Sequence, residues 1–223
     1  MKTYDQFIRE GVYDPNIFKA VFMAGGPGSG KSFVAGKTTG GLGLKMINSD
    51  TPFERFLKKE GLSLKMPEAE TEKRDVERAR AKKVTASKKF HAVKGRLGIL
   101  IDGTGHVYDK VVKQAGMLQQ IGYETSMVFV NTSLEVALAR NEQRARSVMP
   151  KLVKKSWQDV QNNMGKFQNF FGTKSFFIVD NNGVEQDLLQ ISTKLIRRAI
   201  SSPVNNKIAT AWIANEMKKK DRS

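Results

Sequence analysis

Five short apolar runs are spaced along the chain, and each ends at a glycine or a polar residue. The first run, residues 18–24 (FKAVFMA), stops at Gly25 and Gly26. A run of this length and character is typical of a strand buried on both faces of a parallel sheet. The other four predicted strands are residues 44–48, 97–101, 125–130 and 175–179.

Helical patterns fill the stretches between these strands. One helix starts in residues 31–37, and we expect the stretch 39–43 (TGGLG) to break it. The remaining predicted helices are residues 51–60, 107–121, 134–146, 151–171 and 186–200. Because strands that alternate with helices build a parallel sheet covered on both faces, the pattern predicts an α/β fold, a three-layer sandwich around a central five-stranded parallel sheet.

Residues 61–96 fit this alternation least well, because they are densely charged. Acids dominate residues 68–77, whereas residues 78–96 hold eight lysines and arginines and no acid. One interpretation is a solvated helix with acid-to-base contacts one turn apart, such as Glu70 facing Arg74. The other interpretation is a basic wall beside an active site.

The length of 223 residues suits one α/β domain, or one such domain with an appended subdomain. We expect one domain over residues 1–200, in which 61–96 is a charged helical insertion and 134–155 is a lid region. Residues 201–223 are expected to form a basic C-terminal helix. Its apolar face, with Trp212, should dock against the domain while its final lysines stay in water.

Lysine and arginine number 38 against 22 aspartates and glutamates, which gives a formal net charge of +16. An excess of this size sets up a field that attracts polyanions, most simply nucleic acid. An acidic protein or membrane headgroups would satisfy the same physics. Charge therefore indicates a kind of partner but no reaction.

The chain has no cysteine and two histidines, so it has no disulfide-linked partner and lacks the side chains of a Cys/His zinc site. No apolar run approaches the roughly 18 residues that a membrane span needs. Residues 1–11 also lack the apolar core of a signal peptide. We therefore expect a cytoplasmic protein with no membrane partner, and the sequence leaves the oligomeric state open.

A glycine-rich segment directly after the first strand and before the first helix matches the pattern G-x-x-x-x-G-K-[ST]. Its glycines let consecutive backbone N–H groups converge on a phosphate, while the lysine reaches the β- and γ-phosphates and the serine hydroxyl binds magnesium. The pattern predicts a nucleotide site for ATP with Mg²⁺. The predicted ATP-binding residues of this segment are Gly25, Gly26, Pro27, Gly28, Ser29, Gly30, Lys31 and Ser32.

Asp102 closes the third predicted strand and is followed by Gly103 and Thr104. An acid at this place is expected to orient the magnesium ion, and a cap of the Gly-Thr turn is its alternative role. No glutamate follows Asp102 to activate water, which argues against an ATP-driven motor. No N-K-x-D guanine reader is present either, which argues against a GTPase.

Asp50 lies at the mouth of the second strand, next to the nucleotide loop in the usual strand order. Its carboxylate can point at the space beyond the γ-phosphate and accept the proton of an attacking hydroxyl. Asp is also a favoured helix cap, so capping the helix that begins at Thr51 is the competing role. The two roles are compatible.

The predicted helix 134–146 carries Arg140, Arg144 and Arg146. Arg140 and Arg144 are one turn apart and should share a face. A mobile cationic helix over the phosphates excludes water and neutralises the charge on a transferred phosphoryl group. An exposed, salt-bridged face is the alternative interpretation.

Four motifs together resemble the small P-loop kinases that include phage-type polynucleotide 5′-hydroxyl kinases, with zeta-toxin kinases as more distant relatives. They are G-G-P-G-S-G-K-S, I-N-S-D at 47–50, I-L-I-D-G-T at 99–104 and A-R-N-E-Q-R at 139–144. The resemblance spans most of residues 18–182 and implies a P-loop NTPase fold with a helical lid.

The resemblance also implies roles for individual residues. Asp50 matches the general base, Lys31 and Ser32 the phosphate and magnesium contacts, and Arg144 the lid arginine that holds the ATP phosphates, with Arg140 nearby. Asp102 matches an acid that supports the acceptor site or the metal.

One position departs from the family pattern, which often places an arginine three residues after the catalytic aspartate to contact a phosphate of the acceptor. Here that position is Phe53, and Arg55 follows two residues later. Either Arg55 takes over the contact, or the acceptor lacks that phosphate. The acceptor-binding residues that we expect are Asp50, Arg55, Asp102 and Thr104.

These observations predict a magnesium-dependent kinase that moves the γ-phosphoryl group of ATP to a hydroxyl of a nucleic acid, with DNA favoured by the charge. The hydroxyl is either a 5′ end or a hydroxymethyl group on a pyrimidine base, a phage type of DNA modification in the host cytoplasm. One alternative is a small-molecule kinase acting on a nucleoside or a nucleotide sugar, as zeta toxins do. Another is a nucleic-acid-binding protein in which ATP acts only as a switch.

Overall fold

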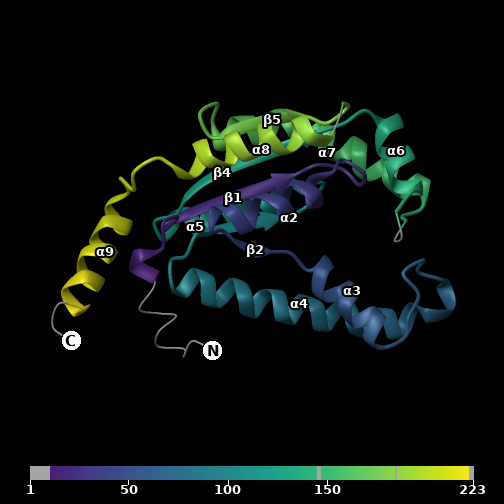
Figure 1. Ribbon diagram of the computed structural model, residues 1–223, viewed down its shortest axis with the longest axis horizontal. Helices are drawn as coiled ribbons and strands as arrows, with labels where there is room; N and C mark the ends of the chain where they lie inside the picture. The colour runs from purple at the N-terminus through teal and green to yellow at the C-terminus, as the bar shows by residue number, and fades with distance from the viewer. Residues whose placement is uncertain (1–10, 145–146, 184, 221–223) are drawn as a thin grey trace.

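A computed structural model describes residues 11–144, 147–183 and 185–220 of the chain. Five parallel strands form one sheet in the order β2-β3-β1-β4-β5 (Figure 1). This sheet confirms the five-stranded parallel arrangement that the sequence predicts. The strands are β1 (Lys19–Ala24), β2 (Lys45–Ile47), β3 (Ile99–Asp102), β4 (Glu124–Asn131) and β5 (Phe176–Asp180).

β1 lies in the centre of the sheet, and all six of its residues are buried. Val21 and Met23 face one layer of the core, whereas Phe22 faces the other. An unbroken apolar run is required because both faces of this strand are covered. In the pairing with β3, Met23 lies opposite Asp102, so the carboxylate that ends β3 comes beside the start of the glycine loop.

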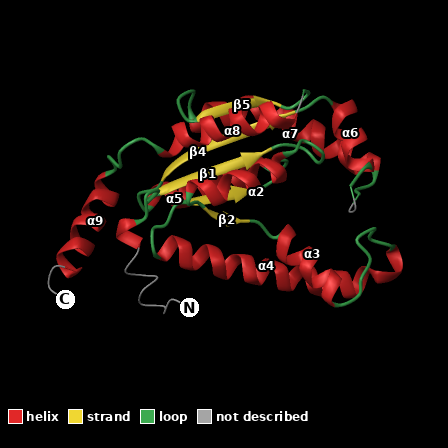
Figure 2. Cartoon of the chain, in the orientation of Figure 1, coloured by secondary structure: helices red, strands yellow, loops and turns green. Residues whose placement is uncertain are grey.

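Helices cover both faces of the sheet and make the three layers (Figure 2). α2 (Lys31–Leu42) and α8 (Glu185–Ile200) pack against each other and against one face. α5 (Tyr108–Gln120) and α7 (Pro150–Phe171) cover the other face. Among the described residues, every helix is too short or too polar to cross a bilayer.

Two further helices, α3 (Asp50–Lys59) and α4 (Thr71–Lys94), lie beyond the β2 edge of the sheet (Figure 1). The short turns η1 (Gly11–Tyr13) and η2 (Glu68–Glu70) precede β1 and α4. α3 and α4 pack through a small separate core made of Phe53, Phe56, Leu57 and Ala81. The charged insertion is therefore a helix anchored by apolar contacts on one side.

The expected contact between Glu70 and Arg74 does not form. Glu70 takes the N-cap position of α4 and accepts the backbone N–H of Ser63 at 2.8 Å. Arg74 donates instead to the carbonyl of Pro67 and the hydroxyl of Thr71. Because Glu70 precedes the first helical turn, its side chain serves the connection before the helix rather than the helix face.

Two helices end several residues away from the ends that the sequence predicts. α2 continues through the glycine-rich stretch to Leu42 and ends at Gly43, which has a φ of 73°. A glycine inside a helix costs only about 1 kcal/mol, and burial of Val34 and Ala35 against the sheet offsets that cost. α6 (Leu134–Glu142) is shorter than expected, and Arg146 lies outside the described residues.

The basic helix α9 (Lys207–Lys220) docks its apolar side on the core, as expected. The ring of Trp212 meets that of Phe18 edge-on at 5.5 Å between centroids, and Ala209 is buried. Lys218 and Lys219 stay exposed. The boundary between a domain 1–200 and a separate unit 201–223 remains a proposal, and residues 1–10 and 221–223 lie outside the described ranges.

Candidate active site

The loop that joins β1 to α2 is built from glycines because its backbone is both left-handed and tightly packed. Gly28 and Gly30 have φ values of 81° and 83°. A Cβ on Gly28 would lie 2.2 Å from the carbonyl oxygen of Ala137 on α6. The loop is therefore pressed against α6, and only glycine fits there.

Hydrogen bonds to residues that follow two other strands hold this loop. The Asn181 side-chain amide, after β5, donates to the Ser29 carbonyl at 2.7 Å. The backbone N–H of Gly25 donates to the carbonyl of Thr104 at 3.0 Å. The loop is therefore held in place. The N–H groups at the start of α2, which have no partner within the helix, form a cradle with it that suits a phosphate.

Lys31, Ser32 and Asp102 meet at the floor of the cradle, as the sequence predicts. The Lys31 Nζ lies 3.9 Å from Asp102 Oδ1, and the Ser32 hydroxyl donates to Asp102 Oδ2 at 3.4 Å. The Asp102 side chain is 3% exposed. The register of β1 and β3 brings these three side chains together, because the two strands are neighbours and end at the same edge of the sheet.

The same group of atoms suits a magnesium ion. Asp102 Oδ1 is buried and has no hydrogen-bond donor among the described residues. A carboxylate and a serine hydroxyl supply the oxygen ligands that Mg²⁺ prefers, and Mg²⁺ usually completes its shell with water and nucleotide phosphates. No group of three or more His, Cys, Asp or Glu side chains forms a metal cage within the described ranges, so the protein alone would not enclose the ion.

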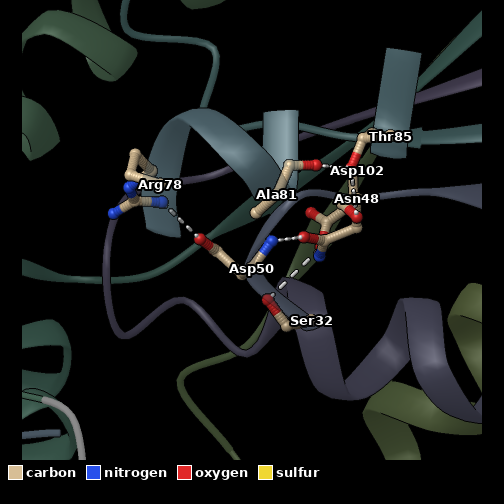
Figure 3. Close-up of polar contacts among 7 residues, drawn as sticks. All are labelled: Ser32, Asn48, Asp50, Arg78, Ala81, Thr85 and Asp102. Atoms are coloured by element: carbon tan, nitrogen blue, oxygen red, sulfur yellow. Dashed lines mark hydrogen bonds and ion pairs between the residues drawn. The ribbon is translucent and has the colours of Figure 1, made fainter. Parts of the chain in front are cut away.

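Asn48 connects Asp102 to Asp50, and sequence reasoning assigned it no role. Its Nδ2 donates to Asp102 Oδ2, and its Oδ1 accepts the backbone N–H of Asp50, both at 2.5 Å. The motif I-N-S-D contains this residue, which was the available signal. Asn48 thus places the first turn of α3 beside the Asp102 carboxylate (Figure 3).

Asp50 is the first residue of α3, and Ser49 occupies the N-cap position. The helix therefore begins one residue earlier than expected, and Asp50 is not its cap residue. The Asp50 side chain is 44% exposed and lies between Asn48 and Arg78 (Figure 3). Its Oδ1 accepts a hydrogen bond from Arg78 Nη1 at 3.2 Å. The carboxylate is thus accessible to a reactant.

Arg55 does not come to the Asp50 carboxylate. Five residues along a helix correspond to a rotation of about 140°, so the two side chains leave α3 in different directions. Arg55 lines a cavity of about 250 Å³ between α3 and α4, together with Asn48, Thr85 and Lys88. Its guanidinium carbon lies 5.4 Å from the ring centroid of Phe56.

Thr104 lies at the cradle, but its hydroxyl is engaged. Its Oγ1 hydrogen-bonds His106 Nδ1, and its carbonyl holds the glycine loop. A second cavity of about 220 Å³ opens at this loop, lined by Asp102, Thr104, His106 and Lys110 among others. His106 and Lys110 were not predicted as site residues, because nothing in their sequence context marks them.

The structure places the two lid arginines differently. Arg140 donates from Nη1 to the carbonyl of Asn181 at 2.9 Å, so it lies beside the residue that holds the glycine loop. Arg144 is exposed in the turn after α6 and does not share a helical face with Arg140. The helix ends early because the Asn141 side chain bonds both the N–H and the carbonyl of Val148 and turns the chain back.

A parallel sheet with a glycine cradle, a lysine and an aspartate at one edge defines the fold of the P-loop kinases. A sequence model of the zeta toxin family matches residues 14–190, and the chain belongs to that family. The zeta-toxin relation, expected to be the more distant one, is thus the one found. The resemblance to phage-type polynucleotide kinases gains no support from the comparisons.

Three solved structures show the same fold at low identity. A putative kinase from Chloroflexus aurantiacus J-10-fl is 17% identical with a TM-score of 0.54, over 81% of this chain and 97% of that one. AvrRxo1-ORF1:-ORF2 with ATP is 12% identical with a TM-score of 0.56, over 80% and 62%. The PezAT toxin–antitoxin system of Streptococcus pneumoniae is 16% identical with a TM-score of 0.51, over 82% and 86%. No curated protein sequence matches the chain.

Proposed function

We propose that this protein is a magnesium-dependent kinase that transfers the γ-phosphoryl group of ATP to a hydroxyl of a small molecule, such as a nucleoside or a nucleotide sugar. The contacts that run from Lys31 through Asp102 and Asn48 to Asp50 carry this proposal. They bring a phosphate-binding lysine and an accessible carboxylate to one edge of the sheet in a member of the zeta toxin family.

The cradle binds the ATP phosphates in this proposal. The backbone N–H groups of the loop and the Lys31 ammonium hold the β- and γ-phosphates, and Arg140 adds positive charge from the lid side. Ser32 and Asp102 hold the magnesium ion, which neutralises charge on the phosphates when bound. The solved AvrRxo1 complex, which contains ATP, supports the choice of nucleotide. Arg144 would reach the phosphates only after the lid closes.

Asp50 acts as the general base on the acceptor. The acceptor oxygen forms a bond to the γ-phosphorus, the bond from that phosphorus to the β–γ bridging oxygen breaks, and ADP leaves with the electron pair. The hydroxyl proton passes to the Asp50 carboxylate as the new bond forms. Asn48 fixes the backbone of Asp50, so the carboxylate needs little rearrangement to reach the acceptor.

The first candidate acceptor is a small molecule, because the resemblance to zeta-toxin kinases implies one. The cavities beside Asn48 and Thr104, about 250 and 220 Å³, also suit small ligands. A nucleic-acid acceptor is the second candidate, because the net charge is +16 and α4 exposes several lysines. The salt dependence of acceptor binding distinguishes the two candidates. Affinity for nucleic acid falls steeply with ionic strength, whereas affinity for a neutral small acceptor does not.

Incubation with γ-labelled ATP, Mg²⁺ and a panel of acceptors tests the proposal. The panel holds nucleosides, nucleotide sugars, 5′-hydroxyl DNA and RNA, and DNA with hydroxymethyl pyrimidines. We expect label on one class of small molecule and none with Lys31→Ala. Label on nucleic acid would support the second candidate, and label released only as free phosphate from every mixture would reject a kinase.

A further inference from the structure

Arg78 lies against Asp50 although 28 residues separate them in the chain. Its Nη1 donates to Asp50 Oδ1 at 3.2 Å, and its guanidinium carbon lies 3.9 Å from the ring centroid of Phe53 (Figure 3). α4 thus delivers a guanidinium group to the carboxylate that begins α3. The proposed reaction gives this arginine no role.

Packing between the two helices fixes the position of Arg78. Phe53, the ring beneath it, is fully buried in the small core that joins α3 to α4. Further along α4, the Thr85 hydroxyl donates to the Ala81 carbonyl at 2.8 Å and lies 3.3 Å from the carbonyl of Asn48, so the helix packs against the residue that follows β2. A guanidinium group stacked on a fixed ring loses little further freedom when it binds a ligand.

Arg78 keeps hydrogen-bonding capacity beyond its bond to Asp50. A guanidinium group has five N–H donors in a planar fork, and one of them bonds Asp50. The other donors have no partner among the residues that the structure describes, and the side chain is 36% exposed. The fork can therefore bond a second anion while it still holds Asp50.

The charges near Arg78 favour such an anion. The adjacent acid, Glu77, is turned toward Arg80, whose Nη1 lies 3.5 Å from Glu77 Oε2. From Arg78 to Arg96 the chain has no further acid. Asp75 lies one turn before Arg78 on α4, but Asp50 is the carboxylate that Arg78 contacts, and the basic run that starts at Arg78 supplies positive charge on the other side.

We propose that Arg78 binds an anionic group of the acceptor next to the hydroxyl that Asp50 deprotonates. The inference rests on the proposed function, because it takes Asp50 as the base. It narrows the acceptor to hydroxyl compounds that also carry a phosphate or a carboxylate. Arg78 is then a specificity-determining residue supplied by the charged insertion.

Binding of inorganic phosphate tests this site without turnover. The probe is added to ¹⁵N-labelled protein saturated with Mg²⁺ and a non-hydrolysable ATP analogue, which fills the glycine cradle, and the arginine side-chain signals are followed by NMR. We expect saturable binding that weakens at least about tenfold in Arg78→Gln, the loss typical of a hydrogen bond to a charged group.

Arg80→Gln is the matched control. Arg80 also lies on α4, pairs with a carboxylate and stacks on an aromatic ring of α3, Phe56, at 4.4 Å. Its loss removes the same charge without touching Asp50, so we expect phosphate binding within about twofold of the wild type, since a distant exposed charge is screened. No phosphate binding by the wild type, or equal weakening in both variants, would overturn the proposal.

Label transfer to paired acceptors separates this inference from the proposed function. With a phosphorylated acceptor and its unphosphorylated counterpart, Arg78→Gln should raise KM for the phosphorylated compound about tenfold and leave that for the neutral one nearly unchanged. Equal effects on both acceptors would reject the inference while the kinase stands. Arg78-dependent phosphate binding without label transfer to any acceptor would reject the kinase and leave the anion site.

Discussion

At the scale of single residues, the site is held together by Asp102 and Asn48, each of which contacts more than one neighbour. Asp102 meets Lys31 and Ser32 on one side and Asn48 on the other. Lys31, Ser32, Asp50 and Asp102 could be predicted from the sequence, because each follows a strand or the glycine pattern and the ends of parallel strands meet at one edge. The contact of Arg78 with Asp50 could not, because it depends on how two helices outside the sheet pack together.

Tyr123 gives a residue-scale prediction for stability. Its ring is buried and its hydroxyl donates to the Leu97 carbonyl at 3.1 Å, and burial raises the pKa of this phenol above its ordinary value of 10.0. Because the pKa of Tyr123 is higher in the folded than in the unfolded chain, its contribution to stability is complete below the pKa of the unfolded chain. The contribution falls above about pH 10 by up to about 1.4 kcal/mol per pH unit.

Urea unfolding of the wild type and Tyr123→Phe between pH 8 and 11 measures this contribution. At pH 8 the variant should be less stable by about 1 kcal/mol, because it lacks the hydrogen bond. Above about pH 10 the difference should shrink and reverse, since the phenylalanine cannot ionise. A difference that stays constant with pH would contradict the prediction.

The elements show where the sequence pattern was sufficient and where it was not. The five strands appear within two residues of their expected bounds, because buried strands need unbroken apolar runs. The glycine-rich end of α2 was expected to break the helix, but tertiary packing decides whether a glycine is tolerated. The end of α6 depends on the Asn141 side chain, so the placement of Arg144 was wrong.

The glycine cradle gives an element-scale prediction. In Gly28→Ala the new Cβ would lie 2.2 Å from the Ala137 carbonyl oxygen of α6, and the left-handed φ of 81° adds about 1 kcal/mol or more of strain. We expect the affinity for ATP, measured by calorimetry, to fall at least about tenfold.

Gly36→Ala on α2, the helix that follows this loop, is the control for this change. A Cβ there meets no atom within 4 Å, so stability should stay equal or rise by up to about 1 kcal/mol. ATP affinity should be unchanged. Normal ATP binding by Gly28→Ala would show that the contact between loop and α6 does not shape the cradle.

At the scale of the whole molecule, the sheet brings the glycine cradle and the Asp50 carboxylate to one edge. In the proposed function the cradle after β1 and the carboxylate that ends β3 hold ATP, while β2 ends at Ile47 and leads through Asn48 into α3 and Asp50. The match to the family model establishes the family, and the coordinates establish the parallel sheet. The net charge alone, in contrast, pointed to a nucleic-acid partner. A net charge is a sum over the whole chain and therefore predicts a partner less well than the geometry of one site.

Single-turnover transfer of labelled phosphate by Asp50→Asn, with ATP affinity measured on the same protein, tests the central claim most directly. The asparagine keeps the shape of the side chain but cannot take the proton, so transfer should slow by about 10² to 10⁴. ATP affinity should stay within about threefold, because in the proposed mechanism Lys31, Ser32 and Asp102, and not Asp50, bind the nucleotide and its metal. Transfer at the wild-type rate, with ATP bound normally, would show that Asp50 is not the base.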